Sequence, residues 1–240
     1  MLSIIKVRKI ALIAAVVAVL VLMGLWYYQR QGFIKIFPTR EDRAVKKILT
    51  IDETKLKGPV GLTDEQAAAE KQKLYESRDK VLANQDDAKA WFDYGFSKEF
   101  WNDHESAVAA WERSFALQPL NFVTALNLGN TYQYFLKDAP RAEYYYEKVL
   151  ELQPDYTSAH QGIIDLYRFN WPEKRGETER VVLRAIKGDP GNTVAYNVIL
   201  VEFFALEGGN ITKAKQYLEE VRRLKPEDAA ELVANYPELQ

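Results

Sequence analysis

The sequence contains no cysteine in its 240 residues, so it can form neither a disulfide nor a thiolate metal site. Its two histidines, His104 and His160, stand far apart and have no metal-ligand spacing. It also lacks a glycine-rich phosphate loop of the P-loop or dinucleotide-binding form. We therefore expect a protein that is not an enzyme and has no catalytic residues, metal, cofactor or small-molecule substrate.

The charge is small overall but unevenly distributed. The net charge is −2, yet residues 1–60 carry 11 basic and four acidic residues, a net +7, and residues 61–240 carry a net −9. Nonspecific nucleic-acid binding requires clustered lysine and arginine, so we expect no nucleic-acid partner for the acidic part. We assign the basic end to a membrane.

Four prolines recur at regular intervals in the C-terminal part of the chain. The intervals between Pro119, Pro154, Pro190 and Pro226 are 35, 36 and 36 residues. A period of 20–50 residues indicates stacked supersecondary units rather than one globule. Since proline cannot continue a helix, each of these prolines marks the end of a unit.

Each unit repeats one pattern over two helical segments. Large side chains recur at helical spacing in the first segment, and a small residue stands where two helices approach closely. In the second segment an alanine typically precedes a large side chain by four positions. The residues that carry the pattern are Trp91, Tyr94, Gly95, Ala107 and Trp111, then Leu128, Gly129, Tyr132, Ala142 and Tyr146, then Ile163, Tyr167 and Ala185, then Tyr196, Ile199, Phe203, Ala214 and Leu218.

This pattern resembles the tetratricopeptide repeat. The resemblance implies an all-α fold, an α-solenoid in which antiparallel helix pairs wind into a right-handed superhelix. It covers residues 87–228 and implies four repeats. Their boundaries are 88–121, 122–156, 157–192 and 193–228.

The chain departs from the family pattern at several positions. Lys98, Ile164, Thr178 and Leu200 replace the usual tyrosine, glycine, alanine and glycine. Repeats 2 to 4 are longer by one or two residues. We expect the additional residues in lengthened turns, at 137–140, 172–176 and 208–210.

The resemblance implies that the first helices of the repeats line a concave groove, which holds a peptide or helix of another protein. A subfamily binds a peptide carboxylate with lysine and asparagine at two groove positions, where this chain has Phe92 and Phe96. We therefore expect apolar anchors from the partner, oriented by amide side chains. The expected groove residues are Lys89, Phe92, Phe96, Glu99, Phe100, Leu126, Asn127, Asn130, Gln133, Tyr134, Gln161, Asp165, Arg168, Phe169, Asn197, Val201 and Phe204.

A second interpretation of the first-repeat aromatics stays open. Phe92, Phe96 and Phe100 are spaced four residues apart, so they also suit packing against a helix expected at about Asp64–Ala83. Thr63 and Gln66 form a capping-box signature at the start of that helix. We expect residues 62–86 to cap the first repeat and residues 229–240 to cap the last one.

Residues Ile10–Tyr28 contain no charged side chain. At about 1.5 Å per residue a helix of this length spans roughly 28 Å, close to the ~30 Å of a bilayer core. The alternative is a cleaved signal peptide, but the segment ends in Trp26, Tyr27 and Tyr28 rather than in small residues. We expect a single-pass transmembrane helix in contact with the lipid bilayer.

The flanks of this segment give conflicting signals on orientation. Residues 1–9 form a short basic tail, and residues 29–61 form a basic stalk with a short amphipathic helix. That helix suits either anionic lipid headgroups or docking on the repeats. Because the leading helix usually dominates, we expect a signal anchor with the repeat domain outside the cytoplasm.

The favoured function is a membrane-anchored protein-interaction scaffold that performs no chemistry. The alternative is a membrane-tethered chaperone or biogenesis factor that presents unfolded clients to an envelope assembly machine. An enzyme would need convergent polar groups in a pocket. The expected groove offers only Asp165 and Arg168, which we interpret as a salt bridge.

Overall fold

The computed structural model describes residues 15–27, 30 and 40–240. The chain divides into two compact units, Met1–Ile51 and Asp52–Gln240. In the first unit, residues 15–27 are helical and α2 runs from Arg40 to Leu49. No helix within the described ranges is both long and apolar enough to cross a membrane. The expected basic tail 1–9 lies outside these ranges, as do residues 10–14 and 28 of the expected span and residues 29 and 31–39 of the stalk.

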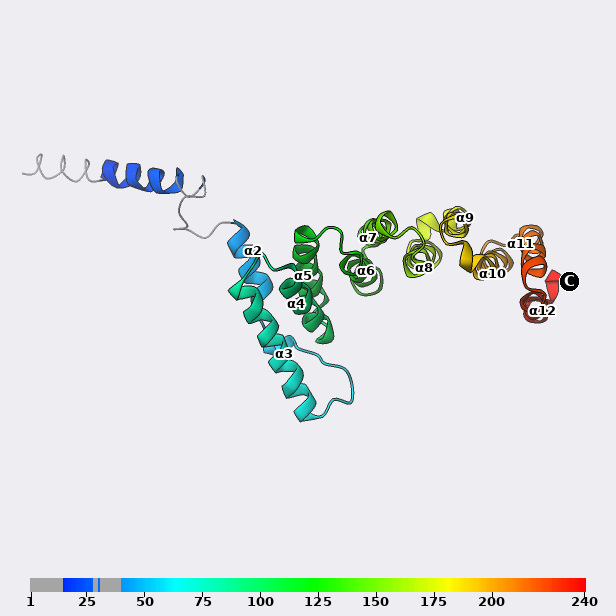
Figure 1. The fold of residues 1–240 in the computed structure, drawn as a ribbon, viewed down its shortest axis with the longest axis horizontal. Helices are drawn as coiled ribbons and strands as arrows, with labels where there is room; N and C mark the ends of the chain where they lie inside the picture. Colours follow the sequence, from blue (N-terminus) through cyan, green and yellow to red (C-terminus); the bar gives the residue numbers. More distant parts are fainter. Residues whose placement is uncertain (1–14, 28–29, 31–39) are drawn as a thin grey trace, which may run out of the picture. The chain divides into compact units, whose positions relative to one another are not determined.

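The second unit is a row of helices, each of which packs on its neighbours in the chain (Figure 1). All of its regular elements are helical. Four helix pairs follow one another between the flanking helices α3 and α12. The elements are η1 Glu53–Lys55, α3 Asp64–Ala83, α4 Ala88–Phe100, α5 His104–Leu117, α6 Phe122–Thr131, η2 Tyr132–Leu136, α7 Ala139–Leu152, α8 Thr157–Asp165, η3 Leu166–Asn170, η4 Pro172–Glu177, α9 Thr178–Gly188, η5 Pro190–Asn192, α10 Thr193–Glu202, η6 Phe203–Glu207, α11 Ile211–Leu224, α12 Pro226–Asn235 and η7 Pro237–Leu239.

Several of the helices begin at a capping side chain. Asp87, Asp103 and Asp138 each accept a backbone N–H of the first turn of the helix that follows. The expected capping box of α3 is formed, since Thr63 and Gln66 exchange hydrogen bonds of 3.0 and 3.2 Å. Local sequence therefore sets where these helices begin, and α3 occupies the residues expected for it.

The first helices of the last three pairs end in a π-helical turn. These turns are η2, η3 and η6, whereas α4 ends without one and leads into a turn in which Asn102 has a φ of 57°. A π-turn accommodates one more residue than an α-helix. The additional residues of repeats 2 to 4, expected only in the turns, are thus accommodated partly inside the first helices.

Two glycines enclose the ring of Tyr146, a fully buried side chain of α7. A methyl group added at Gly129 of α6 would lie 2.7 Å from this ring, and one added at Gly162 of α8 would lie 2.6 Å from it. The ring therefore sits between first helices of adjacent pairs and fixes their separation. Gly95 and Trp111 make a similar close approach in the first pair.

The two ends of the row are covered by helices. On one side, α3 packs on α4 through the buried side chains of Leu74, Ser77 and Val81. On the other side, α12 buries Ala229 and Leu232 and packs on α11. These helices shield the apolar ends of the stack from water.

The segment before α3 is hydrogen-bonded to the turn between α4 and α5. The Lys57 N–H donates to the Trp101 carbonyl at 3.2 Å, and Asn102 Nδ2 donates to the Lys57 carbonyl at 2.5 Å. Glu53 of η1 also pairs with Lys71 of α3 at 2.9 Å. These contacts tie the start of the unit to its first helix pair.

We predict that Gly162→Ala lowers the stability of the protein. The added methyl group collides with the buried Tyr146 ring, and overpacking of this kind costs about 1–3 kcal/mol, more than the gain of at most about 1 kcal/mol in helix propensity. Urea unfolding followed by circular dichroism measures the difference. Gly176→Ala is the matched control, because nothing lies within 4 Å of its added methyl group. Equal stability of the two variants would contradict the role given to the Tyr146 ring.

Candidate functional site

Three aromatic side chains from successive first helices are exposed to solvent. Phe96 of α4 is 60% exposed, Tyr134 of η2 is 44% exposed and Phe169 of η3 is 57% exposed. We call the surface made by α4, α6 with η2, and α8 with η3 the first-helix face. The other members of the expected set that keep partial or full exposure on it are Lys89, Phe92, Glu99, Phe100, Leu126, Asn127, Asn130, Gln161 and Asp165.

The remaining members of the expected set are buried. Gln133 and Arg168 lie beneath the first-helix face, where they make the hydrogen bonds described below. Asn197, Val201 and Phe204 of the fourth pair are also buried, so that pair adds no exposed side chain from this set. The exposed part of the set is therefore confined to the first three pairs.

The first-repeat aromatics have three different environments. Phe92 is half-buried against the core, and its carbonyl accepts the Trp111 Nε1–H at 3.1 Å. Phe100 packs edge-on against Trp101. Phe96 is exposed, whereas the adjacent Ser97 faces α3 and accepts a hydrogen bond from Ser77 at 3.2 Å. The capping helix thus leaves Phe96 open to solvent.

The Tyr146 hydroxyl reaches the amide side chains of α6 and η2. It lies 2.6 Å from Gln133 Oε1 and 2.8 Å from Asn130 Oδ1. Gln133 Nε2 then donates to Asn170 Oδ1 of the next pair at 2.8 Å. Burial raises the pKa of Tyr146, so the phenol stays protonated and able to donate at neutral pH. The amides are consequently held in fixed orientations.

Asp165 is a half-buried carboxylate on the first-helix face. It accepts a hydrogen bond from Gln161 Nε2 at 2.8 Å. Burial raises the pKa of this carboxyl, while the Gln161 bond and the charge of Arg168 oppose the rise. Burial therefore makes ionisation of this side chain less favourable in the folded protein than in the unfolded chain.

The expected Asp165–Arg168 salt bridge is wrong. Arg168 instead pairs with Glu207 of η6, with Nε 3.0 Å from Oε1. Its guanidinium also lies 4.7 Å from the centre of the Phe169 ring. The π-turn of η3 begins directly after Asp165, so Asp165 and Arg168 do not have the regular spacing of an α-helix.

Both histidines have structural contacts. His104 stacks on Phe135 with ring centres 3.9 Å apart, and its Nδ1 lies 2.9 Å from Glu99 Oε2. His160 is buried with Nε2 2.8 Å from the Pro154 carbonyl. In the ranges that the structure covers, no three histidine or acidic side chains gather in a way that could hold a metal ion.

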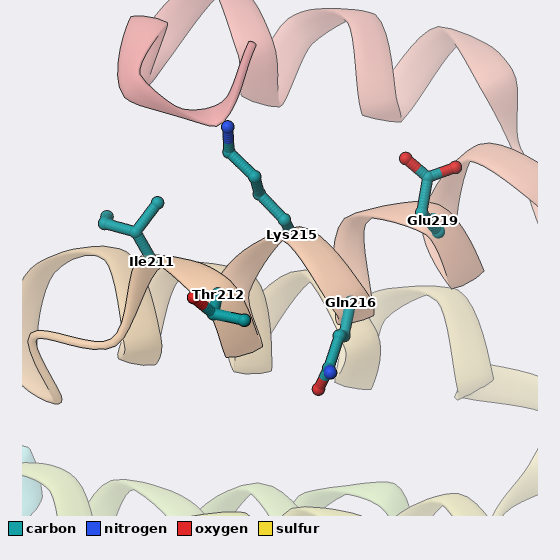
Figure 2. Close-up of a pocket in the computed structure, with 5 residues that line it drawn as sticks. All are labelled: Ile211, Thr212, Lys215, Gln216 and Glu219. Carbon is teal, nitrogen blue, oxygen red and sulfur yellow. The ribbon is translucent and has the colours of Figure 1, made fainter.

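A pocket on α11 was not anticipated from the sequence. Figure 2 shows its lining side chains in two rows along the helix, with Ile211, Lys215 and Glu219 in one row and Thr212 and Gln216 in the other. Its one acid, Glu219, pairs with Arg222, and Lys215 donates to the backbone oxygen of Gln240. The lining residues are Ile211, Thr212, Lys215, Gln216 and Glu219. These charges have partners within the chain, and the pocket offers no reactive group.

Residues 124–156 match the family model described as a tetratricopeptide repeat. The match covers most of the second helix pair, including Gly129, Tyr146 and Pro154. No curated protein matches the chain. The protein thus contains a tetratricopeptide repeat within a stack of helix pairs. Such repeats are typically non-catalytic, and this one suggests a scaffold for protein–protein interaction with protein partners.

We predict that Tyr146→Phe destabilises the protein by about 1–3 kcal/mol, because it leaves the buried Gln133 carbonyl without its donor. Chemical denaturation measures the change. The control is Tyr144→Phe, since Tyr144 is an exposed neighbour on the same helix and should tolerate the loss of its hydroxyl. If both variants unfold at the wild-type denaturant concentration, the hydroxyl does not stabilise the amides.

Proposed function

We propose that this protein is an interaction scaffold that binds a segment of another protein on its first-helix face and performs no chemistry there. The observation that carries the proposal is the row of exposed aromatics, Phe96, Tyr134 and Phe169, on three consecutive helix pairs. Aromatic side chains dominate the energy of protein interfaces, and a row across several repeats suits an elongated ligand.

The surroundings of these aromatics support a binding role. Asn130 and Gln161 stand among them with polar atoms directed by hydrogen bonds within the chain. A side chain whose orientation is already fixed loses little conformational entropy when it binds. The aromatics therefore supply apolar contact, and the amides orient the partner.

We predict that the double variant Phe96→Ala with Phe169→Ala lowers partner recovery by about tenfold or more, because truncation of buried aromatic anchors typically costs 2 kcal/mol or more. The measurement is quantitative crosslinking and recovery from the cells that make the protein, compared between variants. Tyr144→Ala is the matched control, since this side chain is 53% exposed on α7 rather than on a first helix.

Each outcome of this experiment has a clear meaning. Loss of one partner in the double variant alone supports a scaffold. Loss of many unrelated partners would favour the chaperone or biogenesis factor. Retention of every partner by a correctly folded double variant would contradict the use of this face.

We propose further that residues Ile10–Tyr28 anchor the protein in a lipid bilayer, with the repeat domain outside the cytoplasm. The support is the uncharged sequence, about long enough for a bilayer core, with aromatic residues at one end. An anchor would confine the first-helix face to a membrane surface and raise its local concentration near other membrane proteins.

We predict that the full chain stays in the membrane fraction after extraction with alkaline carbonate, whereas a chain with Leu20→Arg and Leu22→Arg is released. Each arginine at the centre of a span costs about 2.5 kcal/mol or more. Substitution of Leu117 and Leu120, which are exposed in the second unit, is the control.

The orientation is tested by protease digestion. Protease added to cells that keep an intact cytoplasmic membrane, but whose outer layers have been permeabilised, should digest the repeats. Full protection would reverse the proposed orientation.

A further inference from the structure

Several acids of the second unit bridge neighbouring elements through lysine or arginine, whereas others, such as the buried Asp189, are held by neutral donors. Asp165 belongs to the second group. Among the described residues Asp165 has no such ion pair, and Gln161 is its hydrogen-bond donor. The paired acids are Glu143 with Lys174 at 2.9 Å, Glu179 with Lys213 at 2.5 Å, Glu147 with Arg184 at 2.8 Å, and Glu207 with Arg168.

The nearest candidate cation within the chain is already engaged. Arg168 pairs with Glu207 and packs over Phe169, and its side chain is 9% exposed. The charge of Asp165 also acts on the phenols of Tyr134 from η2 and Tyr146 from α7, and both phenols are neutral at physiological pH. Among the described residues the carboxylate thus has a neutral hydrogen-bond donor but no ion pair, and it can still accept a hydrogen bond from an incoming cation.

The setting of this carboxylate is apolar and aromatic. Tyr134 lies close enough for the Asp165 charge to raise the pKa of its phenol, after the larger effect of burial. Phe169 follows Asp165 by about one turn and exposes more than half of its side chain. A carboxylate beside exposed aromatic rings favours a cationic side chain, which gains both a charge-assisted hydrogen bond and attraction to the ring faces.

We infer that Asp165 receives the lysine or arginine of a partner segment whose neighbouring apolar side chains pack on Tyr134 and Phe169. This inference rests on the proposed function, because it names the chemistry of the segment bound on the first-helix face. An acidic segment, or a free C-terminal carboxylate at this point, would meet repulsion from Asp165. The ligand class is thus a basic residue in an otherwise apolar protein segment.

The energetics of the free protein agree with a binding role. A carboxyl whose pKa is raised by folding destabilises the folded state once the pH exceeds its ordinary pKa. At neutral pH, Asp165 therefore costs the free protein some stability. Residues that function in binding often lower the stability of the free protein, and their substitution then raises that stability.

The test uses the full 240-residue chain in a mild detergent and a phage-displayed library of random 16-residue peptides. We expect the wild-type chain to enrich peptides in which lysine or arginine stands between aromatic or aliphatic residues. The best peptide, labelled with a fluorophore, is then titrated against the variants. Asp165→Asn should weaken binding by about 10- to 100-fold, as expected for loss of a charge-assisted hydrogen bond.

Two controls separate binding from folding. Asp155→Asn, in the exposed turn before α8, removes an equal charge and should leave the affinity unchanged. Asp165→Asn should unfold at the wild-type temperature or above it, because the amide can still accept the Gln161 bond and the cost of ionisation is gone. A lower unfolding temperature for Asp165→Asn would assign this side chain a structural role and overturn the inference.

A double-mutant cycle decides whether Asp165 and the basic residue meet. The peptide is made with methionine in place of its lysine or arginine and titrated against wild type and Asp165→Asn. We expect the peptide change to weaken binding to the wild type and to have little effect on the Asp165→Asn variant. Equal losses in both proteins would overturn the inference.

The same experiment distinguishes this inference from the proposed function. Peptides that lack a basic residue, but whose binding is lost in Phe96→Ala with Phe169→Ala, would support the first-helix face and overturn the role of Asp165. Peptides that bind equally well to that double variant would overturn both proposals. Failure to enrich any peptide would count against both as well.

Discussion

The stack depends on the close approach of glycine backbone to an aromatic ring. Tyr146 lies between Gly129 in its own helix pair and Gly162 in the next, and its ring fills the space that two side chains would otherwise occupy. One side chain therefore sets the separation of two first helices. Since packed interiors tolerate little change in volume, this contact fixes the position of everything carried on α6 and α8.

The same residue links the core to the first-helix face. Its ring belongs to the interior, whereas its hydroxyl meets the amides of Asn130 and Gln133. Gln133 extends the connection to Asn170 in the following pair. The tight packing that holds the helices together thus also orients polar groups near the surface. The packing of Tyr146 thus contributes both to the stability of the stack and to the geometry of the candidate site.

The periodic features of the fold could be predicted from the sequence, because they follow from local chemistry. The prolines, the glycines opposite large rings and the Thr63–Gln66 capping box each act within a few residues or at a fixed repeat spacing. The π-turns could not be predicted in this way, since they depend on how α6, α8 and α10 pack against their neighbours. The π-turn that follows Asp165 changes the helical spacing there, and Arg168 pairs with Glu207 instead of Asp165. The exposure of individual aromatic side chains could not be predicted from the sequence either. Phe92 and Phe96 share the same helical spacing, but only Phe96 is exposed to solvent.

The distribution of charge explains why the first-helix face is the better binding surface. The acids of the second helices, such as Glu143, Glu147 and Glu179, meet cations of the following helix pair and join successive pairs. Acids that are already paired attract a charged partner only weakly. A partner that separated such a pair would lose the free energy of its contact. The first helices of the second and third pairs are joined mainly by neutral amides and a phenol. These neutral links supply no ion pair to Asp165, so a partner that brings a cation can gain a charge-assisted contact there.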